Sequence, residues 1–385
     1  YIMKLKLLLS LIISFCLVSC SDDDGPEVKK ESSRTLLVYM VSDNSLYSFG
    51  ESDLKEMLTA ARNGGLKNDG RLLVYYASGV TPELREITPD GIVTLKTYDD
   101  VTSSVTVSTM RRVMADMHQL APANDYALVM WSHSSGWLKP SVSAPQNRSW
   151  GVENSTGGAE MSIPELADAL RGEHFSFMYF DCCYMGNIET LYELRGITDY
   201  VVASPTEIPS DGMPYNLNVG CFFELVPDLK GAARNTFDYY DVQSGKYRSC
   251  TISVYDMSKI DRVAKATRNI MLENLILPAD YTPQGYGVGN KFRDKYYDLG
   301  YYALSLTDNA SLQSEFQSAM DDFVIYKEAT DYMWNSLKLE HCSGVSSYIV
   351  KADDEGISKA DNYGYFDLEW SDDVVIPAFS AHSLM

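Results

Sequence analysis

Short, nearly continuous apolar runs recur along the chain and constrain its fold more than any other feature of the sequence. They are TLLVYMV (35–41), RLLVYYA (71–77), YALVMWS (126–132), FSFMYFD (175–181) and YVVASP (200–205). Such runs suit strands that are buried on both faces of a parallel sheet. Segments with helical periodicity lie between them, among them ESDLKEMLTAAR, VSTMRRVMADMHQL and SIPELADAL. This alternation predicts an α/β fold with helices on both faces of a mainly parallel sheet.

Local signals add detail to this prediction. Ser162 and Glu165 have the S-x-x-E spacing of a capping box, which predicts a helix start. The stretch 84–98 reads as a hairpin with its turn near Pro89-Asp90-Gly91. A further strand is expected at CTISVYD (250–256), and the chain then reads as mostly helical up to SGVSSYIV (343–350).

The N-terminus has the pattern of an export signal. Lys4 and Lys6 precede an apolar run at 7–18 that is too short to span a bilayer comfortably. The ending LVSC resembles a bacterial lipobox, which implies a lipid on Cys20, although an ordinary secretory signal is the alternative. The polar segment after it predicts a disordered tether, and its acidic start resembles the surface-export signal of some Bacteroidetes lipoproteins. We therefore expect a lipid-anchored protein of the outer membrane or cell surface.

The predicted organisation is a signal peptide at 1–20, a tether at 21–34, a catalytic core at 35–256 and a C-terminal helical part at 257–385 that completes the same domain. The 385 residues carry a formal net charge of −21. Nucleic acid is therefore an unlikely partner, because little here would neutralise phosphates. An acidic protein favours basic substrates, although net charge often reports only solubility.

The cysteines do not form a disulfide framework. Five of the seven remain once Cys16 and Cys20 are set aside, and an odd number in an exported protein indicates a free thiol. None of them has zinc-ribbon or C-x-x-C spacing. A redox motif and a structural zinc site are both disfavoured.

Chemically capable residues follow two of the predicted strands. His133 comes directly after YALVMWS, and Asp181, Cys182 and Cys183 end FSFMYFD just before a helical pattern. Ligands of parallel sheets bind beyond the carboxyl ends of the strands. A thiol at a helix N-terminus is a better thiolate, and a histidine across the cleft completes its activation. The structural alternative is that the histidine is only a hydrogen-bonded polar residue and that the cysteine is a small core residue.

The segments WSHSSGW (131–137) and DCCYMGNIE (181–189) resemble the two main motifs of the clostripain family of cysteine peptidases, relatives of gingipains, caspases and legumain. The likeness continues in VVASPTEIPSDGMPY (201–215) and more loosely in CSGVSSYIV (342–350). It implies a caspase-like α/β/α sandwich and an endopeptidase that uses a Cys–His dyad. Protein or peptide substrates are the implied partners.

The resemblance assigns His133 and Cys183 as the dyad, with Cys182 where the family usually has alanine. We expect Cys182 to face the apolar layer as a small hydrophobe. Backbone N–H groups of Ser134 and Cys183 are expected to form the oxyanion hole. Ser134 replaces a usual glycine, which would narrow the site if its side chain pointed inward.

Two carboxylates are expected to select Arg or Lys at P1. Asp181 faces the same way as Cys183 by strand alternation, and Asp211 matches the position at which relatives carry a pocket acid. Two such groups can hold a guanidinium or an ammonium. The alternative for Asp181 is that it only caps the following helix.

Relatives are often matured by a cut between the two motifs. The stretch 138–158 is rich in Ser, Pro, Asn and Gly and reads as an exposed loop. Arg148 is the favoured processing site and Lys139 the second, which predicts a zymogen. An uncut surface loop is the alternative.

Two other classes of function were weighed. A catalytically inactive surface lipoprotein could bind glycan or host protein on the same scaffold, using some of the 27 tyrosines and 5 tryptophans. A metallohydrolase is disfavoured, because the five histidines include no H-E-x-x-H motif. No cofactor is implied, although some relatives need calcium.

Overall fold

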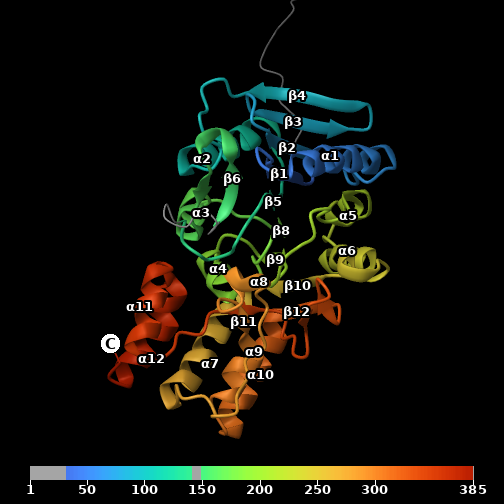
Figure 1. Cartoon of the computed structure of the whole chain (residues 1–385). Coiled ribbons are helices and arrows are strands. Elements are labelled where there is room, and N and C mark those ends of the chain that lie inside the picture. The colour runs from blue at the N-terminus through green and yellow to red at the C-terminus, as the bar shows by residue number, and fades with distance from the viewer. Residues whose placement is uncertain (1–31, 141–148, 385) are drawn as a thin grey trace, which may run out of the picture. The chain divides into compact units, whose positions relative to one another are not determined.

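The structure is a computed structural model that describes residues 32–140 and 149–384. Within them, the largest sheet has the strand order β12-β10-β9-β8-β5-β1-β2-β3-β4 (Figure 1). Its strands are β1 (Thr35–Val41), β2 (Arg71–Ala77), β3 (Glu83–Thr88), β4 (Gly91–Thr97), β5 (Tyr126–Trp131), β8 (Phe177–Asp181), β9 (Tyr200–Ala203), β10 (Thr251–Asp256) and β12 (Val324–Ala329). The neighbours from β2 through β1, β5 and β8 to β9 are parallel, and the pairs at both edges are antiparallel. The predicted α/β class and mainly parallel sheet are confirmed.

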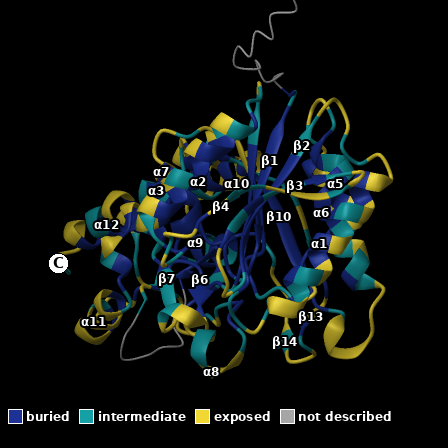
Figure 2. Cartoon of the chain, turned by 90° about the horizontal axis from the view of Figure 1, so that it is seen from above, coloured by how far each residue is buried: buried dark blue, intermediate teal, exposed yellow. Residues whose placement is uncertain are grey.

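The central strands are buried because both of their faces are covered. Alternate residues of β1 enter two separate apolar clusters, Leu37 and Tyr39 on one side and Leu36 and Val38 on the other. Each strand therefore needs an apolar residue at every position, which is why the sequence runs are continuous. Figure 2 shows these buried strands lying between helices with exposed outer surfaces.

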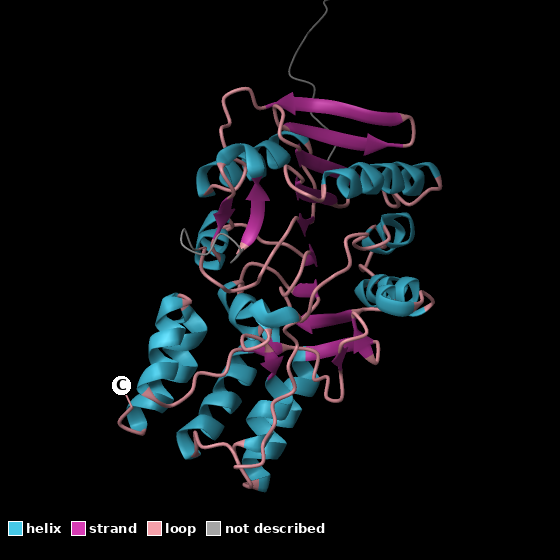
Figure 3. Ribbon diagram, in the orientation of Figure 1, coloured by secondary structure: helices cyan, strands magenta, loops and turns pink. Residues whose placement is uncertain are grey.

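Helices cover both faces of the sheet (Figures 1 and 3). One face carries α1 (Tyr47–Arg62), α5 (Tyr215–Phe222) and α6 (Leu229–Asp241). The other carries α2 (Val107–Leu120), α3 (Ile163–Ala169), α4 (Ile188–Glu193), α7 (Ile260–Glu273), α9 (Leu299–Ser305), α10 (Ala310–Phe323), α11 (Asp354–Asn362) and α12 (Ile376–Ala381). The capping box of Ser162 and Glu165 begins α3 as predicted, with both of its hydrogen bonds present.

Shorter elements join this framework. They are α8 (Gly289–Phe292) and the two-stranded ribbons β6–β7 (Trp150–Glu153 with Ala159–Met161), β11–β15 (Tyr297–Asp298 with Ser346–Ser347) and β13–β14 (Tyr332–Met333 with Leu337–Lys338). The described residues all belong to a unit that runs from Glu31 to Met385. Helices from the C-terminal part share an apolar cluster with the central strands, so the two parts have a common core.

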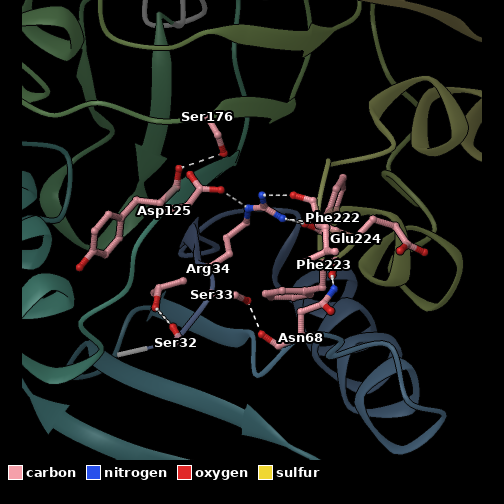
Figure 4. Close-up of polar contacts among 12 residues, drawn as sticks. Ser32, Ser33, Arg34, Asn68, Asp125, Ser176, Phe222, Phe223 and Glu224 are labelled. Atoms are coloured by element: carbon pink, nitrogen blue, oxygen red, sulfur yellow. Dashed lines mark hydrogen bonds and ion pairs between the residues drawn. The ribbon is translucent and has the colours of Figure 1, made fainter. Parts of the chain in front are cut away.

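The predicted tether extends too far. Most of it lies outside the described residues, but Ser32 and Arg34 are buried at its end. The Arg34 guanidinium donates to Asp125 Oδ2 at 2.5 Å and to the carbonyl oxygens of Phe222 and Glu224 at 2.7 and 2.8 Å (Figure 4). These contacts fix the start of β1 against β5 and the end of α5, so the ordered chain begins before residue 35.

The predicted loop 138–158 is also wrong in part. Residues 141–148 lie outside the described residues, but Leu138, Ser149 and Trp150 are fully buried and β6 follows at once. Trp150 packs edge-on against Tyr39 of the central sheet. The composition of this stretch predicted a loop where the structure has a buried strand. The tertiary contacts of Trp150 outweigh the turn preference of the residues around it.

Candidate active site

Two neighbouring strands bring the predicted dyad to one place. Trp131 ends β5, Asp181 ends β8, and these two residues are cross-strand partners in a parallel pair. His133 and Cys183 each lie two residues beyond that pair. Both line a cavity of about 240 Å³ at the carboxyl end of the sheet. Its other lining residues are Leu46, Trp131, Ser132, Asp181, Cys182, Glu207, Ile208, Pro209, Ser210, Gly212 and Trp334.

The thiol of Cys183 is held by the loop that follows β9. Its Sγ accepts a hydrogen bond from the Ile208 N–H at 3.3 Å and approaches the Ile208 carbonyl oxygen at 3.7 Å. Burial, followed by the nearby charge of Glu207, raises the pKa of Cys183 to about 12. The thiol is therefore protonated at neutral pH in this conformation.

Cys183 does not lie at a helix N-terminus, which corrects the sequence interpretation. The helix α4 begins at Ile188, where Asn187 caps it through the Thr190 N–H. Tyr184 interrupts any earlier helix, because its φ of 61° is left-handed and its N–H donates to the Thr206 carbonyl. A helix dipole therefore does not activate this thiol directly.

Cys182 occupies the apolar layer, as expected. It is 3% exposed, belongs to the larger apolar cluster and directs its Sγ toward the Met130 carbonyl oxygen at 3.6 Å. Burial raises its pKa well above the ordinary value for a thiol. Both cysteines border the cavity, but their sulfur atoms have different partners: Cys182 Sγ points to the Met130 carbonyl oxygen, and Cys183 Sγ contacts the backbone of Ile208.

His133 is positioned by the loop between β1 and α1. Its Nε2 lies 2.8 Å from Ser45 Oγ, and its carbonyl oxygen accepts the Gly151 N–H at 3.0 Å. The β6 strand thus fixes the backbone of His133, and Ser45 fixes the ring. Sequence inspection missed Ser45, because nothing in its local sequence marks it as a partner of a histidine 88 residues away.

Ser134 does not narrow the cavity. Its hydroxyl donates to the Ser149 carbonyl oxygen at 2.6 Å and accepts the Gly136 N–H at 3.0 Å, and the residue is not among those lining the cavity. Among the described residues, no hydrogen bond engages the backbone N–H of Ser134 or of Cys183. Within the described part of the chain, both donors that were predicted for the oxyanion hole are therefore without a backbone acceptor.

The two predicted pocket acids lie differently. Asp181 is 5% exposed, lines the cavity and accepts the Met213 N–H at 3.0 Å. Asp211 is exposed and is not among the lining residues, although Ser210 and Gly212 on either side of it are. Gly212 is required there, because a Cβ at its φ of 65° would come within 2.9 Å of the Asp181 carboxylate.

A second buried carboxylate accompanies Asp181. Asp53 of α1 is 3% exposed and accepts a hydrogen bond from Trp131 Nε1 at 2.8 Å. Burial, followed by the charge of Asp181, raises the pKa of Asp53, and burial raises that of Asp181. The pair therefore resists double ionisation. Nothing in the sequence indicated that Asp53, in the helix α1, lies beside Asp181.

Glu207 is the acid of the cavity that the sequence interpretation missed. It is partly buried, and its carboxylate accepts Trp334 Nε1 at 2.7 Å and the Tyr184 hydroxyl at 3.2 Å. The segment SPTEIPSDG contains both acids, but the resemblance to the family favoured Asp211, which lies in the same loop as Glu207.

Only one of the two predicted processing residues lies among the residues that the structure describes. Arg148 lies outside the described residues. The Lys139 side chain is 59% exposed and pairs with Asp367 at 2.6 Å, while its N–H donates to the Tyr363 carbonyl oxygen.

The remaining features of the described chain concern thiols, metals and membranes. All five described cysteines are free thiols. Residues 32–140 and 149–384 contain no cluster of three or more His, Cys, Asp or Glu side chains suited to a metal ion. No helix in the same residues is long and apolar enough to cross a bilayer.

Comparison with known proteins finds one matching family model and similar solved structures. The family model described as the clostripain family matches residues 38–362. The chain is similar to an inactive zymogen C11 protease from Parabacteroides distasonis (29% identity, TM-score 0.76, 90% of this chain and 99% of that chain). It is also similar to a secreted C11 cysteine protease from Bacteroides thetaiotaomicron in complex with an irreversible peptide inhibitor (31% identity, TM-score 0.74, 89% and 98%). No curated protein matches.

Proposed function

Since this chain belongs to the clostripain family and is a cysteine-type peptidase, we propose that it cleaves peptide bonds after Arg or Lys, with Cys183 and His133 as its catalytic dyad. The observation that carries the proposal is that both residues follow the ends of two paired parallel strands and line one cavity. Side chains so placed can reach a common scissile bond.

The proposed reaction begins with transfer of the Cys183 thiol proton to the His133 imidazole. The thiolate attacks the scissile carbonyl carbon, and the oxygen takes up the electron pair near the N–H groups of Ser134 and Cys183. The C–N bond then breaks, and the imidazolium protonates the leaving amine. Water, deprotonated by His133, hydrolyses the thioester and restores the thiol.

The protonated thiol fits a resting form of such an enzyme. Burial and the charge of Glu207 hold the pKa of Cys183 high, so the thiol has to lose its proton to His133 before it can attack. One similar structure is an inactive zymogen. We propose that this chain is also made inactive and is matured by a cut in the segment that contains Arg148, with Lys139 as the second site.

Basic P1 specificity is supported by Asp181, which borders the cavity directly. The resemblance assigned Asp211 to the same pocket, but that acid lies at the exposed turn between two lining residues and does not itself border the cavity. A cation in the cavity would favour the ionised form of Asp181, whose pKa burial now raises. A neutral P1 side chain would leave that acid without compensation.

The dyad is tested by alanine variants with matched controls. We expect Cys183→Ala to abolish turnover of a fluorogenic Arg-P1 peptide and His133→Ala to lower kcat at least about a hundredfold. Cys182→Ala removes a neighbouring core thiol, and His118→Ala removes a surface histidine that pairs with Glu173. Both controls should keep measurable turnover. If Cys183→Ala kept the wild-type rate and Cys182→Ala had no turnover, the nucleophile would be Cys182 and not Cys183.

A further inference from the structure

Glu207 occupies a position in the cavity that the proposed dyad does not use. It directly precedes Ile208, the residue whose backbone holds the Cys183 thiol. It borders the same cavity as Cys183, His133 and Asp181. Glu207 and Asp181 also border a second, much smaller void beside Pro209. Two carboxylates therefore face the space next to the thiol.

The carboxylate of Glu207 is held in place by two separate elements. Trp334, in the turn of the β13–β14 ribbon, donates to one oxygen, and Tyr184, directly after Cys183, donates to the other. The Tyr184 hydroxyl is itself fixed by the Val288 N–H at 3.1 Å. A side chain locked from both ends loses little conformational entropy when it binds a ligand.

Each Glu207 oxygen keeps acceptor capacity after these contacts, because a carboxylate oxygen can accept two hydrogen bonds. Its two hydrogen-bond donors are neutral side chains. The charge of Lys291 favours the ionised form of Glu207, but burial outweighs it and raises the pKa of Glu207. A partly buried acid of this kind gains most from a cation brought into the cavity.

The shape of the cavity fits one side chain. Its volume of about 240 Å³ lies below the roughly 300 Å³ at which pockets for small-molecule ligands begin. Asp211, by contrast, projects from the exposed turn and borders neither void. The loop after β9 thus offers two acids, of which only Glu207 faces the space beside the thiol.

We propose that Glu207 is a specificity-determining residue that receives the cationic P1 side chain of the substrate together with Asp181, while Asp211 contributes little. The inference rests on the proposed peptidase function and goes beyond it in naming the residue that recognises charge. The competing role is purely structural, with Glu207 serving only to anchor Trp334.

The two roles are separated by comparing peptides that differ only at P1, with arginine in one and its neutral isostere citrulline in the other. An anchoring role would lower kcat/KM for both peptides alike. A recognition role lowers it selectively for arginine. The variants are Glu207→Gln, the charge-retaining Glu207→Asp, and Asp211→Asn as the matched acid on the same loop. Glu207→Met provides a second neutral variant should Glu207→Gln not fold.

We expect the arginine-to-citrulline ratio of kcat/KM to fall about tenfold or more in Glu207→Gln, as loss of a hydrogen bond to a charged group implies. Glu207→Asp should keep part of the ratio, and Asp211→Asn should keep nearly all of it. An undiminished ratio in Glu207→Gln, or an equal loss with both peptides, overturns the inference. So does a ratio that falls in Asp211→Asn instead.

These outcomes are distinct from failure of the proposed function. If the wild-type enzyme does not prefer arginine to citrulline, the basic P1 specificity itself fails. If Cys183→Ala still turns over either peptide, the dyad fails. Only a wild type that prefers arginine and depends on Cys183 tests Glu207, and the ratio in its variants then decides.

Discussion

At the scale of single residues, the adjacent cysteines illustrate how environment separates identical side chains. Cys182 is buried in the apolar cluster and Cys183 is held by the backbone of Ile208, although one peptide bond joins them. The resemblance to the family motif, in which alanine usually stands at the position of Cys182, predicted this burial of Cys182. The raised pKa of Cys183 could not be predicted from the sequence, because it depends on burial of the thiol and on the charge of Glu207, a residue far from it in the chain.

The buried acid pair predicts a dependence of stability on pH. The pKa of Asp53 is raised by folding, so the native state holds a proton that the unfolded state releases above its ordinary value of about 4. Stability is therefore lost as pH rises from that value through the raised pKa. Asp53→Asn removes this loss.

We expect Asp53→Asn to gain at least about 1 kcal/mol relative to wild type between pH 5 and pH 8, measured by urea unfolding at each pH. Asparagine keeps an acceptor for Trp131 Nε1. The exposed Asp211→Asn is the control and should change little between the two pH values. A stability difference that is the same at both pH values would contradict a shared proton in this pair.

At the scale of elements, β1 depends on contacts beyond its own ladder. Arg34 precedes the strand and connects it with Asp125 before β5 and with the carbonyl groups at the end of α5 (Figure 4). The guanidinium is 7% exposed and Asp125 is 27% exposed. Removing it leaves an acid and two carbonyl groups short of their donor.

Arg34→Ala is therefore expected to cost about 3 kcal/mol of unfolding free energy, measured by chemical denaturation. Arg112→Ala is the matched control, because Arg112 forms an exposed two-bond pair with Asp100, so its removal should cost much less than the removal of Arg34. Equal effects of the two substitutions would show that Arg34 is not an anchor.

The ribbon β6–β7 is the element that composition concealed. It fixes the His133 backbone through Gly151 and receives the Ser134 hydroxyl at Ser149. Its two short strands, WGVE and AEM, lie among turn-forming residues of the stretch 138–158, and they are recognised as strands only from their pairing with each other and with the segment after β5.

At the scale of the whole molecule, the segment containing Arg148 is expected to control activity. In the sequence it connects the segment that contains His133 with β6, so a cut there would separate the two motifs into different chains. Labelling by a biotinylated peptidyl electrophile with Arg at P1 should be slow in Arg148→Ala;Lys139→Ala and fast in the processed wild type. Fully active enzyme that consists only of an uncut chain would refute maturation by cleavage.

We also propose that the molecule is lipid-anchored through Cys20, which lies outside the described residues. In the producing cell, Cys20→Ser should move the protein from the membrane fraction to the soluble fraction, as detected by immunoblotting after ultracentrifugation. Its peptidase activity should be unchanged, because residue 20 precedes the unit that holds the cavity. Retention of the variant in membranes would refute this anchor.

The sequence by itself determined the central strands of the large sheet, the α/β class and the two segments that bear the proposed dyad. Those properties are local: TLLVYMV and RLLVYYA carry their burial in every residue, and their bounds match β1 and β2. Tertiary structure alone decided which acids border the cavity, how Ser45 holds His133, and that Cys183 precedes a left-handed turn rather than a helix. The physical reason is that burial, charge pairing and backbone strain arise from contacts between residues far apart in the chain, and no local pattern encodes them.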